Sequence, residues 1–181
     1  MDFLSLSNIS TAEIKNGLDQ YLSTLDPAMP NSLTELLTDG GIIYSKFESY
    51  KDALEAAPPH LNEGYREHVA RRQQLRTALE DLMATHDLDA LFYLHNLYAA
   101  QFINEHYDYT KVRLSSVSGL PAIVVPGGYT SDNLPVGVEF LTAAFDEPKL
   151  LSLAYAYEQS TRHRRNPPLT PPLKSDFVKL P

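Results

Sequence analysis

The sequence predicts an α+β (mixed α/β) domain, in which a small mixed sheet with a β-hairpin is packed by a long central helix and a C-terminal helix. Residues 62–86 show the spacing of an amphipathic helix, with apolar residues on one face and charged residues on the other. Residues 122–126 and 135–141 are apolar runs rich in β-branched residues, and a turn-rich connection joins them. A second amphipathic stretch follows Asp146.

Composition and charge exclude several classes of protein. The 181 residues are 43% hydrophobic and 21% charged, which is typical of a globular chain. They contain no cysteine, which excludes a disulfide scaffold, a thiolate metal site and a cysteine nucleophile. The net charge of −8 disfavours a nucleic-acid or anionic-membrane binder. No apolar run reaches the ~18 residues of a membrane-spanning helix, and no signal peptide is recognised, so we expect a cytoplasmic protein.

Two helices are expected near the N-terminus. Ser10 and Glu13 have the spacing of a capping box, and they begin a helix that we expect to run to about Leu25. Ser32 and Glu35 have the same spacing and begin a second, short helix. Each of these helices is therefore predicted from its start signal.

The middle of the chain alternates between clear and ambiguous stretches. Aromatic residues recur every three positions within residues 42–59, which is compatible with a helix but does not distinguish it from other structures. The long helix over 62–86 follows, and the short apolar run 90–94 after it is interpreted as a buried strand. Residues 96–109 are rich in aromatic and amide side chains and are left unassigned.

The C-terminal helix is expected to begin after Asp146, a favourable N-cap, and to end near Arg164. Apolar residues at helical spacing predict its inner face, and these are Leu150, Leu151, Ala154 and Tyr157. Residues 166–181 contain five of the thirteen prolines, so we expect an extended tail there and a single domain over residues 1–165.

Four blocks in the C-terminal part of the chain carry a recognisable pattern. They are LSSVSGLPAIVVPGG at 114–128, LPVGVEFL at 134–141, FDEPKLL at 145–151 and AYAYEQ at 154–159. In this order and spacing they resemble the C-terminal part of the amidase signature family, and residues 88–91 agree with it more loosely. The resemblance implies a fold in which one large mixed sheet is wrapped by helices.

The resemblance also implies a chemistry. Members of the family cleave carboxamides with a serine nucleophile, a second serine in a cis peptide bond, and a lysine, while glycine-rich backbone amides hold the oxyanion. The two serines lie in and near a stretch of the form Gly-Gly-Ser-Ser-Gly-Gly-Ser, and the lysine lies upstream of it.

The sequence departs from this pattern at the catalytic residues. Its glycine pairs are followed by Ile42 and Tyr129, and Ser115 and Ser116 have no flanking glycine pair. The resemblance therefore implies that the chain begins downstream of the family's catalytic half. We carry over no catalytic residue, assign no substrate-binding residue, and expect no metal and no cofactor. A second departure is His95, which follows Leu94 where family members usually have proline and threonine.

One catalytic constellation can be assembled from the residues alone. Ser116 or Ser118 with His95 and Asp108 would complete a serine–histidine–acid set. Neither serine has the spacing of a nucleophile elbow. The alternative, which we favour, is that the serines satisfy backbone groups in an irregular segment before a buried strand.

Other candidate groups also have structural interpretations. The histidines at 60, 95 and 106 lack metal-ligand spacing. Asp87 and Asp89 fit a helix-to-strand turn better than a pair of opposed catalytic carboxylates. Gly127 and Gly128 fit a chain leaving a strand with positive φ better than a phosphate loop.

Three sets of polar residues complete the candidates. Residues 162–165 fit a cationic helix C-terminus, with a phosphate or carboxylate site as the sharper alternative. Arg71 and Arg72 fit the solvated face of the long helix. In the family, loops before the main blocks help to line the acyl-binding side of the pocket, and the polar residues here are Tyr98, Gln101, Asn104, Tyr107, Asp108 and Arg113.

Three hypotheses for the function follow. The chain is a truncated or isolated C-terminal portion of an amidase-like protein that self-associates and does not hydrolyse amides. Alternatively, it is the pocket-forming subunit of a split amidase, active only with a partner that carries the catalytic half. In the third, it is a binding or interaction module that still holds a small carboxamide. All three share one requirement: the hairpin strands are apolar on both faces, so helices, a second copy or another polypeptide must cover them.

Overall fold

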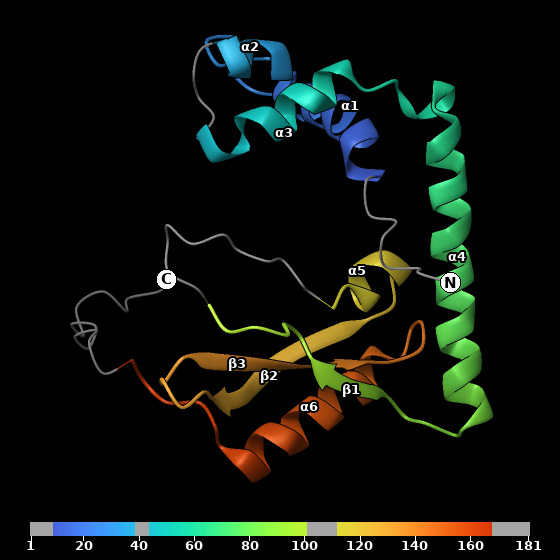
Figure 1. The fold of residues 1–181 in the computed structure, drawn as a ribbon, viewed down its shortest axis with the longest axis vertical. Coiled ribbons are helices and arrows are strands. Elements are labelled where there is room, and N and C mark those ends of the chain that lie inside the picture. The colour runs from blue at the N-terminus through green and yellow to red at the C-terminus, as the bar shows by residue number, and fades with distance from the viewer. Residues whose placement is uncertain (1–8, 39–43, 101–111, 168–181) are drawn as a thin grey trace. The chain divides into compact units, whose positions relative to one another are not determined.

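The computed structural model describes residues 9–38, 44–100 and 112–167. Figure 1 shows the elements in chain order. The chain divides into two compact units: unit 1 is Met1–Asp87 with Arg113–Leu120, and unit 2 is Leu88–Val112 with Pro121–Pro181. Each unit is described by itself below. The single domain over residues 1–165 stays a prediction, and residues 168–181 of the expected tail lie outside the described residues.

Every secondary-structure element in the described residues of unit 1 is a helix. Its elements are α1 (Ile9–Leu22), α2 (Leu33–Thr38), α3 (Tyr44–Glu55), the 3₁₀ turn η1 (Pro59–Leu61), α4 (Glu63–Thr85) and α5 (Leu114–Ser118). The helices predicted in the N-terminal part and over 62–86 are confirmed, and the ambiguous stretch contains the helix α3. The segment expected to be irregular before the hairpin is the short helix α5 instead.

Start signals determine where two of these helices begin. The Asn62 side chain accepts a hydrogen bond from the Tyr65 backbone N–H at 3.1 Å and caps α4. Ser32 Oγ likewise accepts from the Glu35 N–H at 3.3 Å, which confirms the predicted start of α2. The prediction for Ser10 is wrong, because α1 already begins at Ile9 and Ser10 lies inside it. The difference is small, since the first turn of a helix frays and its boundary varies by one or two residues.

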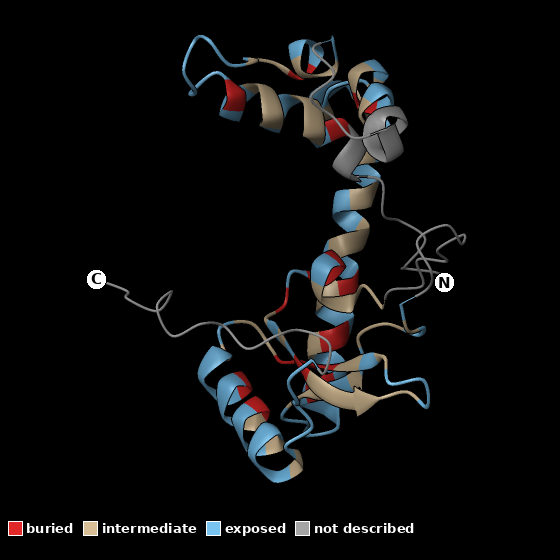
Figure 2. Cartoon of the chain, turned by 90° about the vertical axis from the view of Figure 1, so that its left-hand side faces the viewer, coloured by how far each residue is buried: buried red, intermediate tan, exposed pale blue. Residues whose placement is uncertain are grey.

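The long helix α4 buries a narrower face than its sequence predicts. Leu75, Leu79 and Met83 are buried, whereas Val69 and Leu82 of the expected apolar face are exposed. Figure 2 shows the buried positions toward the C-terminal half of this helix.

Arg72 corrects a second expectation about α4. Its Nε donates to the Val117 carbonyl and its Nη2 to the Ser116 carbonyl, each at 2.9 Å. These are carbonyls in the last turn of α5, which have no partner within so short a helix. Arg72 therefore ties α5 to α4 and is not only part of a solvated face, while Arg71 forms an ion pair with Glu67 on the same helix.

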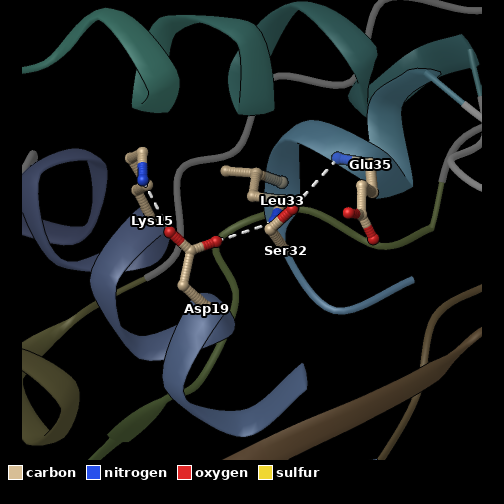
Figure 3. A network of polar contacts seen from close by, with 5 residues as sticks. All are labelled: Lys15, Asp19, Ser32, Leu33 and Glu35. Atoms are coloured by element: carbon tan, nitrogen blue, oxygen red, sulfur yellow. Dashed lines mark hydrogen bonds and ion pairs between the residues drawn. The ribbon is translucent and has the colours of Figure 1, made fainter. Parts of the chain in front are cut away.

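Asp19 links α1 to α2, as Figure 3 shows. Its Oδ1 accepts the backbone N–H of the fully buried Leu33 at 2.7 Å, and its Oδ2 accepts Lys15 Nζ at 2.6 Å. The N–H of Leu33 lies in the first turn of α2, where no helical carbonyl can accept it. The hydrogen bond from Lys15, followed by that from the Leu33 backbone, lowers the pKa of the Asp19 carboxyl.

Unit 2 contains a three-stranded sheet and one helix. The strands are β1 (Leu91–Leu94), β2 (Ala122–Tyr129) and β3 (Pro135–Leu141), and the helix is α6 (Glu147–Thr161). The order is β1-β3-β2 with both pairings antiparallel, so the described part of the expected mixed sheet is antiparallel. The α+β class, the hairpin and the C-terminal helix are confirmed.

The hairpin is longer than the sequence predicts, because β2 continues through its glycines. A bulge between Pro126 and Gly128 shifts the register, and Gly128 has φ of +134°, which is accessible mainly to glycine. A Cβ at Gly127 would lie 2.6 Å from Cγ1 of Val138, so a side chain there would collide with β3. The turn follows at Thr130, whose N–H donates to the Leu134 carbonyl at 2.9 Å.

Helix α6 packs on β2 and β3 to form the core of unit 2. Val125, Val138 and Phe140 from the strands meet Leu150 and Ala154 from the helix. The helix is buried along one side and exposed along the other (Figure 2).

Two burial predictions for unit 2 are wrong. Leu151 is 60% exposed, and the inner face of α6 is formed by Leu150 and Ala154 together with the partly buried Leu153 and Tyr157. Phe92 and Leu94 are also exposed, at 52% and 45%, because β1 is an edge strand and α6 packs mainly on the other two strands.

Both ends of α6 differ from the sequence prediction, in the N-cap contact at one end and in the last residue at the other. Asp146 stands at the N-cap, but its side chain makes no cap hydrogen bond and pairs with Lys149 at 3.1 Å. Lys149 also pairs with Asp89 at 3.2 Å, and hydrogen bonds to Asp146 first and Asp89 second raise the pKa of its ammonium. The helix ends at Thr161, three residues before the predicted end, with Arg162 in the left-handed region at φ of 48°.

No helix in the described ranges is both long enough and apolar enough to cross a membrane.

We predict that Asp19→Ala lowers the free energy of unfolding by about 1–3 kcal/mol, because it leaves the buried Leu33 N–H without an acceptor. Asp19→Asn is the matched control, since it keeps an oxygen for Leu33 and loses only the charge that pairs with Lys15. Urea unfolding of the full chain at pH 7 measures both variants. Equal losses in the two variants would contradict the assigned role of the Leu33 contact.

The lowered pKa of the Asp19 carboxyl predicts that the stability of the chain depends on pH. Its folded pKa is lower than its ordinary value of 3.8, so the stabilisation is fully present above that value and is lost as pH falls through the folded pKa. The stability difference between wild type and Asp19→Asn should therefore shrink as urea unfolding is repeated below pH 3.8. A difference that stays constant at acidic pH would contradict this assignment.

Candidate functional site

A buried carboxylate is the centre of the main polar cluster in unit 2. Glu139 lies on the central strand β3 and is only 1% exposed. Its Oε1 accepts the Tyr93 hydroxyl at 2.8 Å, and its Oε2 lies 2.5 Å from Nδ1 of His95. We call these three residues the Glu139 cluster. Burying a carboxylate is costly unless it is hydrogen-bonded, and here both oxygens have partners.

The strand register brings the cluster together. Tyr93 is the direct neighbour of Glu139 in the antiparallel pair of β1 and β3, so both side chains lie on the same face. His95 follows β1, and its backbone N–H donates to the Gly137 carbonyl at 3.1 Å, which extends the pairing past Leu94. This face is opposite the one that carries Phe140 and packs against α6.

The chemistry available to the cluster depends on His95. A carboxylate at Nδ1 orients an imidazole so that Nε2 can exchange a proton with a hydroxyl or water. In the described part of the chain, no serine or threonine hydroxyl hydrogen-bonds to His95. The arrangement therefore holds β1 and the residues after it against β3, and it presents one oriented imidazole that is 36% exposed.

The two serines of the hypothetical serine–histidine–acid set form hydrogen bonds with backbone groups instead. Ser116 Oγ donates to the Arg113 carbonyl at 3.2 Å. Ser118 Oγ donates to the Leu114 carbonyl at 2.6 Å and accepts the Leu120 N–H at 3.2 Å. The interpretation that these hydroxyls satisfy backbone groups is confirmed, although the segment is a helix. Both serines belong to unit 1 and His95 to unit 2, and Asp108 lies outside the described residues.

The other candidates fall in separate places. His60 lies in η1, His106 lies outside the described residues, and the described residues contain no group of three or more potential metal ligands. Asp87 has a positive φ of 50° just after α4, which fits the predicted turn. Among the polar residues of 96–113, Gln101, Asn104, Tyr107 and Asp108 also lie outside the described residues. The basic run 162–165 does follow the end of α6.

Glu139, the centre of this candidate site, is the residue that sequence reasoning missed. It stands inside the apolar strand PVGVEFL, and its acidic side chain is the one charged group in that run. A charge inside an otherwise apolar strand is a usable signal, because a buried carboxylate needs partners. The signal does not identify those partners, which lie 44 and 46 residues away in the chain.

Comparisons with known proteins agree on one relationship. No family model matches the chain. A stretch of 163 residues, 86% of this chain, is 28% identical to a probable amidase of Arabidopsis thaliana and covers 29% of it. A stretch of 55 residues, 30% of this chain, is 44% identical to one subunit of the glutamyl-tRNA(Gln) amidotransferase of Syntrophus aciditrophicus and covers 11% of that subunit.

A solved structure extends the likeness to the fold. The peptide amidase of Stenotrophomonas maltophilia is 32% identical, with a TM-score of 0.66, over 88% of this chain and 34% of its own. The chain thus spans about a tenth to a third of the length of the relatives it matches. The relatives and structural neighbours are amidase signature proteins, and the matches fall on their C-terminal portion.

We predict that Tyr93→Phe lowers the free energy of unfolding by about 1–2 kcal/mol, because it removes a donor from a buried carboxylate. Tyr155→Phe is the matched control, since the Tyr155 side chain is exposed on α6 and should change stability by less than about 0.5 kcal/mol. Urea unfolding measures both. A Tyr93 variant as stable as the Tyr155 control would show that the cluster does not stabilise unit 2.

Proposed function

We propose that this chain, which corresponds over most of its length to the C-terminal part of amidase signature proteins, serves as a non-catalytic part of an amidase-like scaffold and does not hydrolyse amides by itself. One observation carries the proposal: about nine-tenths of the chain matches the peptide amidase, but the match covers only 34% of that enzyme. The family's Gly-Gly-Ser-Ser stretch has no counterpart among the 181 residues.

The geometry of the serines supports the same proposal. The Ser118 hydroxyl is buried and engaged by two backbone groups, so it is not positioned as a nucleophile. Ser116 Oγ bonds to a backbone carbonyl of its own turn. A serine nucleophile needs a neighbouring base to take its proton, and neither hydroxyl has a basic side chain as its hydrogen-bond partner in the described part of the chain.

A second candidate function is that of one component in a split amidase. The amidotransferase relative is itself named as a subunit, which describes a part of an assembly. The exposed apolar residues of β1, Phe92 and Leu94, give this alternative a physical basis, because an apolar edge strand favours association. The partner in this alternative is a polypeptide that carries the serine-rich stretch and the lysine.

The third hypothesis, a module that binds a small carboxamide without turnover, rests on the same relationship and has no separate observation in its favour. The first proposal includes self-association through the edge strand β1. A second copy of the chain then covers the apolar strands in place of another polypeptide. A cytoplasmic location is also part of the proposal.

We predict that the purified full chain releases no ammonia from simple carboxamides or peptide amides above the buffer rate. The reason is that neither Ser116 nor Ser118 is activated as a nucleophile. Ammonia release over a panel of amides measures this. Turnover by the chain alone that is lost in Ser116→Ala would overturn the proposal.

Purification of the chain from its source cells, with identification of each co-purifying polypeptide, separates the first two functions. A partner with the Gly-Gly-Ser-Ser stretch, and hydrolysis that appears only in the mixture, would establish the split amidase. A Ser→Ala change in that partner should then abolish hydrolysis. A homo-oligomer without turnover would support the scaffold proposal.

A further inference from the structure

A groove of about 920 Å³ lies in unit 2 at the turn end of the hairpin. Strand β2 contributes Val124 and Tyr129 to its wall, β3 contributes Pro135 and Val136, and the residues after α6 contribute 164–167. Sites for small molecules commonly have volumes of about 300–1,000 Å³, so the groove is large enough for one. It does not include any member of the Glu139 cluster.

The wall formed by the strands is apolar and open. Val124 is 47% exposed and lies on the edge strand β2, on the sheet's face opposite α6. The groove is also lined by Gly137, where a Cβ would approach Cγ1 of Val124 to 2.9 Å. A side chain at that position would displace the valine, so glycine preserves the shape of the apolar wall.

The opposite rim carries two arginines. Arg165 stacks on Tyr129, with its Cζ 3.6 Å from the ring centroid, and its Nη2 donates to Oδ1 of Asn133 at 2.9 Å. Arg164 Nη1 donates to Oδ1 of Asn166 at 2.8 Å. A guanidinium has five N–H donors, and Asn133 is the single hydrogen-bond acceptor of Arg165 among the described residues. Its remaining donors are available at the rim.

The charge of this rim is uncompensated. Neither arginine forms an ion pair with a carboxylate within the described residues, although the whole chain carries a net charge of −8. Two adjacent cations beside an apolar wall fit a ligand with one anionic end and an apolar body. The contacts of Arg165 with Tyr129 and Asn133 hold the guanidinium in place, which lowers the cost of ordering it on binding.

We propose that this groove binds a small organic carboxylate, whose apolar body lies on the exposed Val124 and whose carboxylate is held by Arg165, with Arg164 adding charge. The planar fork of a guanidinium matches a carboxylate with two parallel hydrogen bonds. The rim follows the C-terminus of α6, where the helix dipole opposes anions, and it opposes a doubly charged phosphate more strongly than a singly charged carboxylate. This inference does not depend on the proposed function.

The test is a titration of the ¹⁵N-labelled full chain, followed by amide chemical shifts. The probe is 4-phenylbutyrate, and its neutral match is 4-phenylbutyramide. We expect saturable shifts at Gly128 and Gly137, with a dissociation constant of about 0.1–1 mM, and binding of the amide weaker by about tenfold or more. Equal or tighter binding of the amide would overturn the inference, and so would shifts confined to residues outside the groove.

Two variants test the arginine itself. Arg165→Gln removes the charge and should weaken 4-phenylbutyrate binding by about tenfold. Arg71→Gln is the matched control, because Arg71 is an arginine of unit 1 that pairs with Glu67, and it should leave the affinity unchanged. A well-dispersed amide spectrum confirms that each variant folds. An Arg165 variant that binds like wild type would overturn the inference, as would inorganic phosphate that displaces the probe at equal concentration.

Discussion

The antiparallel pairing of β3 with both of its neighbours is the constraint on which unit 2 depends. As the central strand, β3 aligns β1 and β2 and presents a different chemistry on each face. One face places Val138 and Phe140 against α6, and the other holds Glu139 between the edge strands. Because side chains alternate along a strand, a register shift of one residue would exchange these faces and place the carboxylate in the apolar core.

Much of this architecture could be predicted from the sequence, because its signals are local. The cap at Asn62, the capping box at Ser32 and the glycines of the hairpin all act within a few residues of themselves. Which of the apolar residues are buried could not be predicted in the same way. Periodicity shows which side of α6 is apolar, but whether Leu151 or Phe92 is covered depends on which strands the helix crosses.

The candidate site was less predictable than the fold, because its contacts join residues far apart in the chain. His95 stands out in the sequence as a departure from the family pattern and Glu139 does not, but the two form one hydrogen-bonded pair. The serines show the opposite case. Their spacing allows a catalytic interpretation, and only the geometry of Ser118 shows that its hydroxyl satisfies the backbone.

The bulge in β2 connects the hairpin to the groove at its end. It places an extra residue in β2, and the strand then regains its pairing at Gly128 opposite Val136 and continues to Tyr129 opposite Pro135. The ring of Tyr129 is the surface on which Arg165 stacks, so the position of the cation is set by the same glycine-dependent register that closes the hairpin. A residue with a side chain at position 128 would strain the backbone at its positive φ and move the ring. The hairpin glycines, which in sequence suggest only a turn, therefore also determine where a charge is presented.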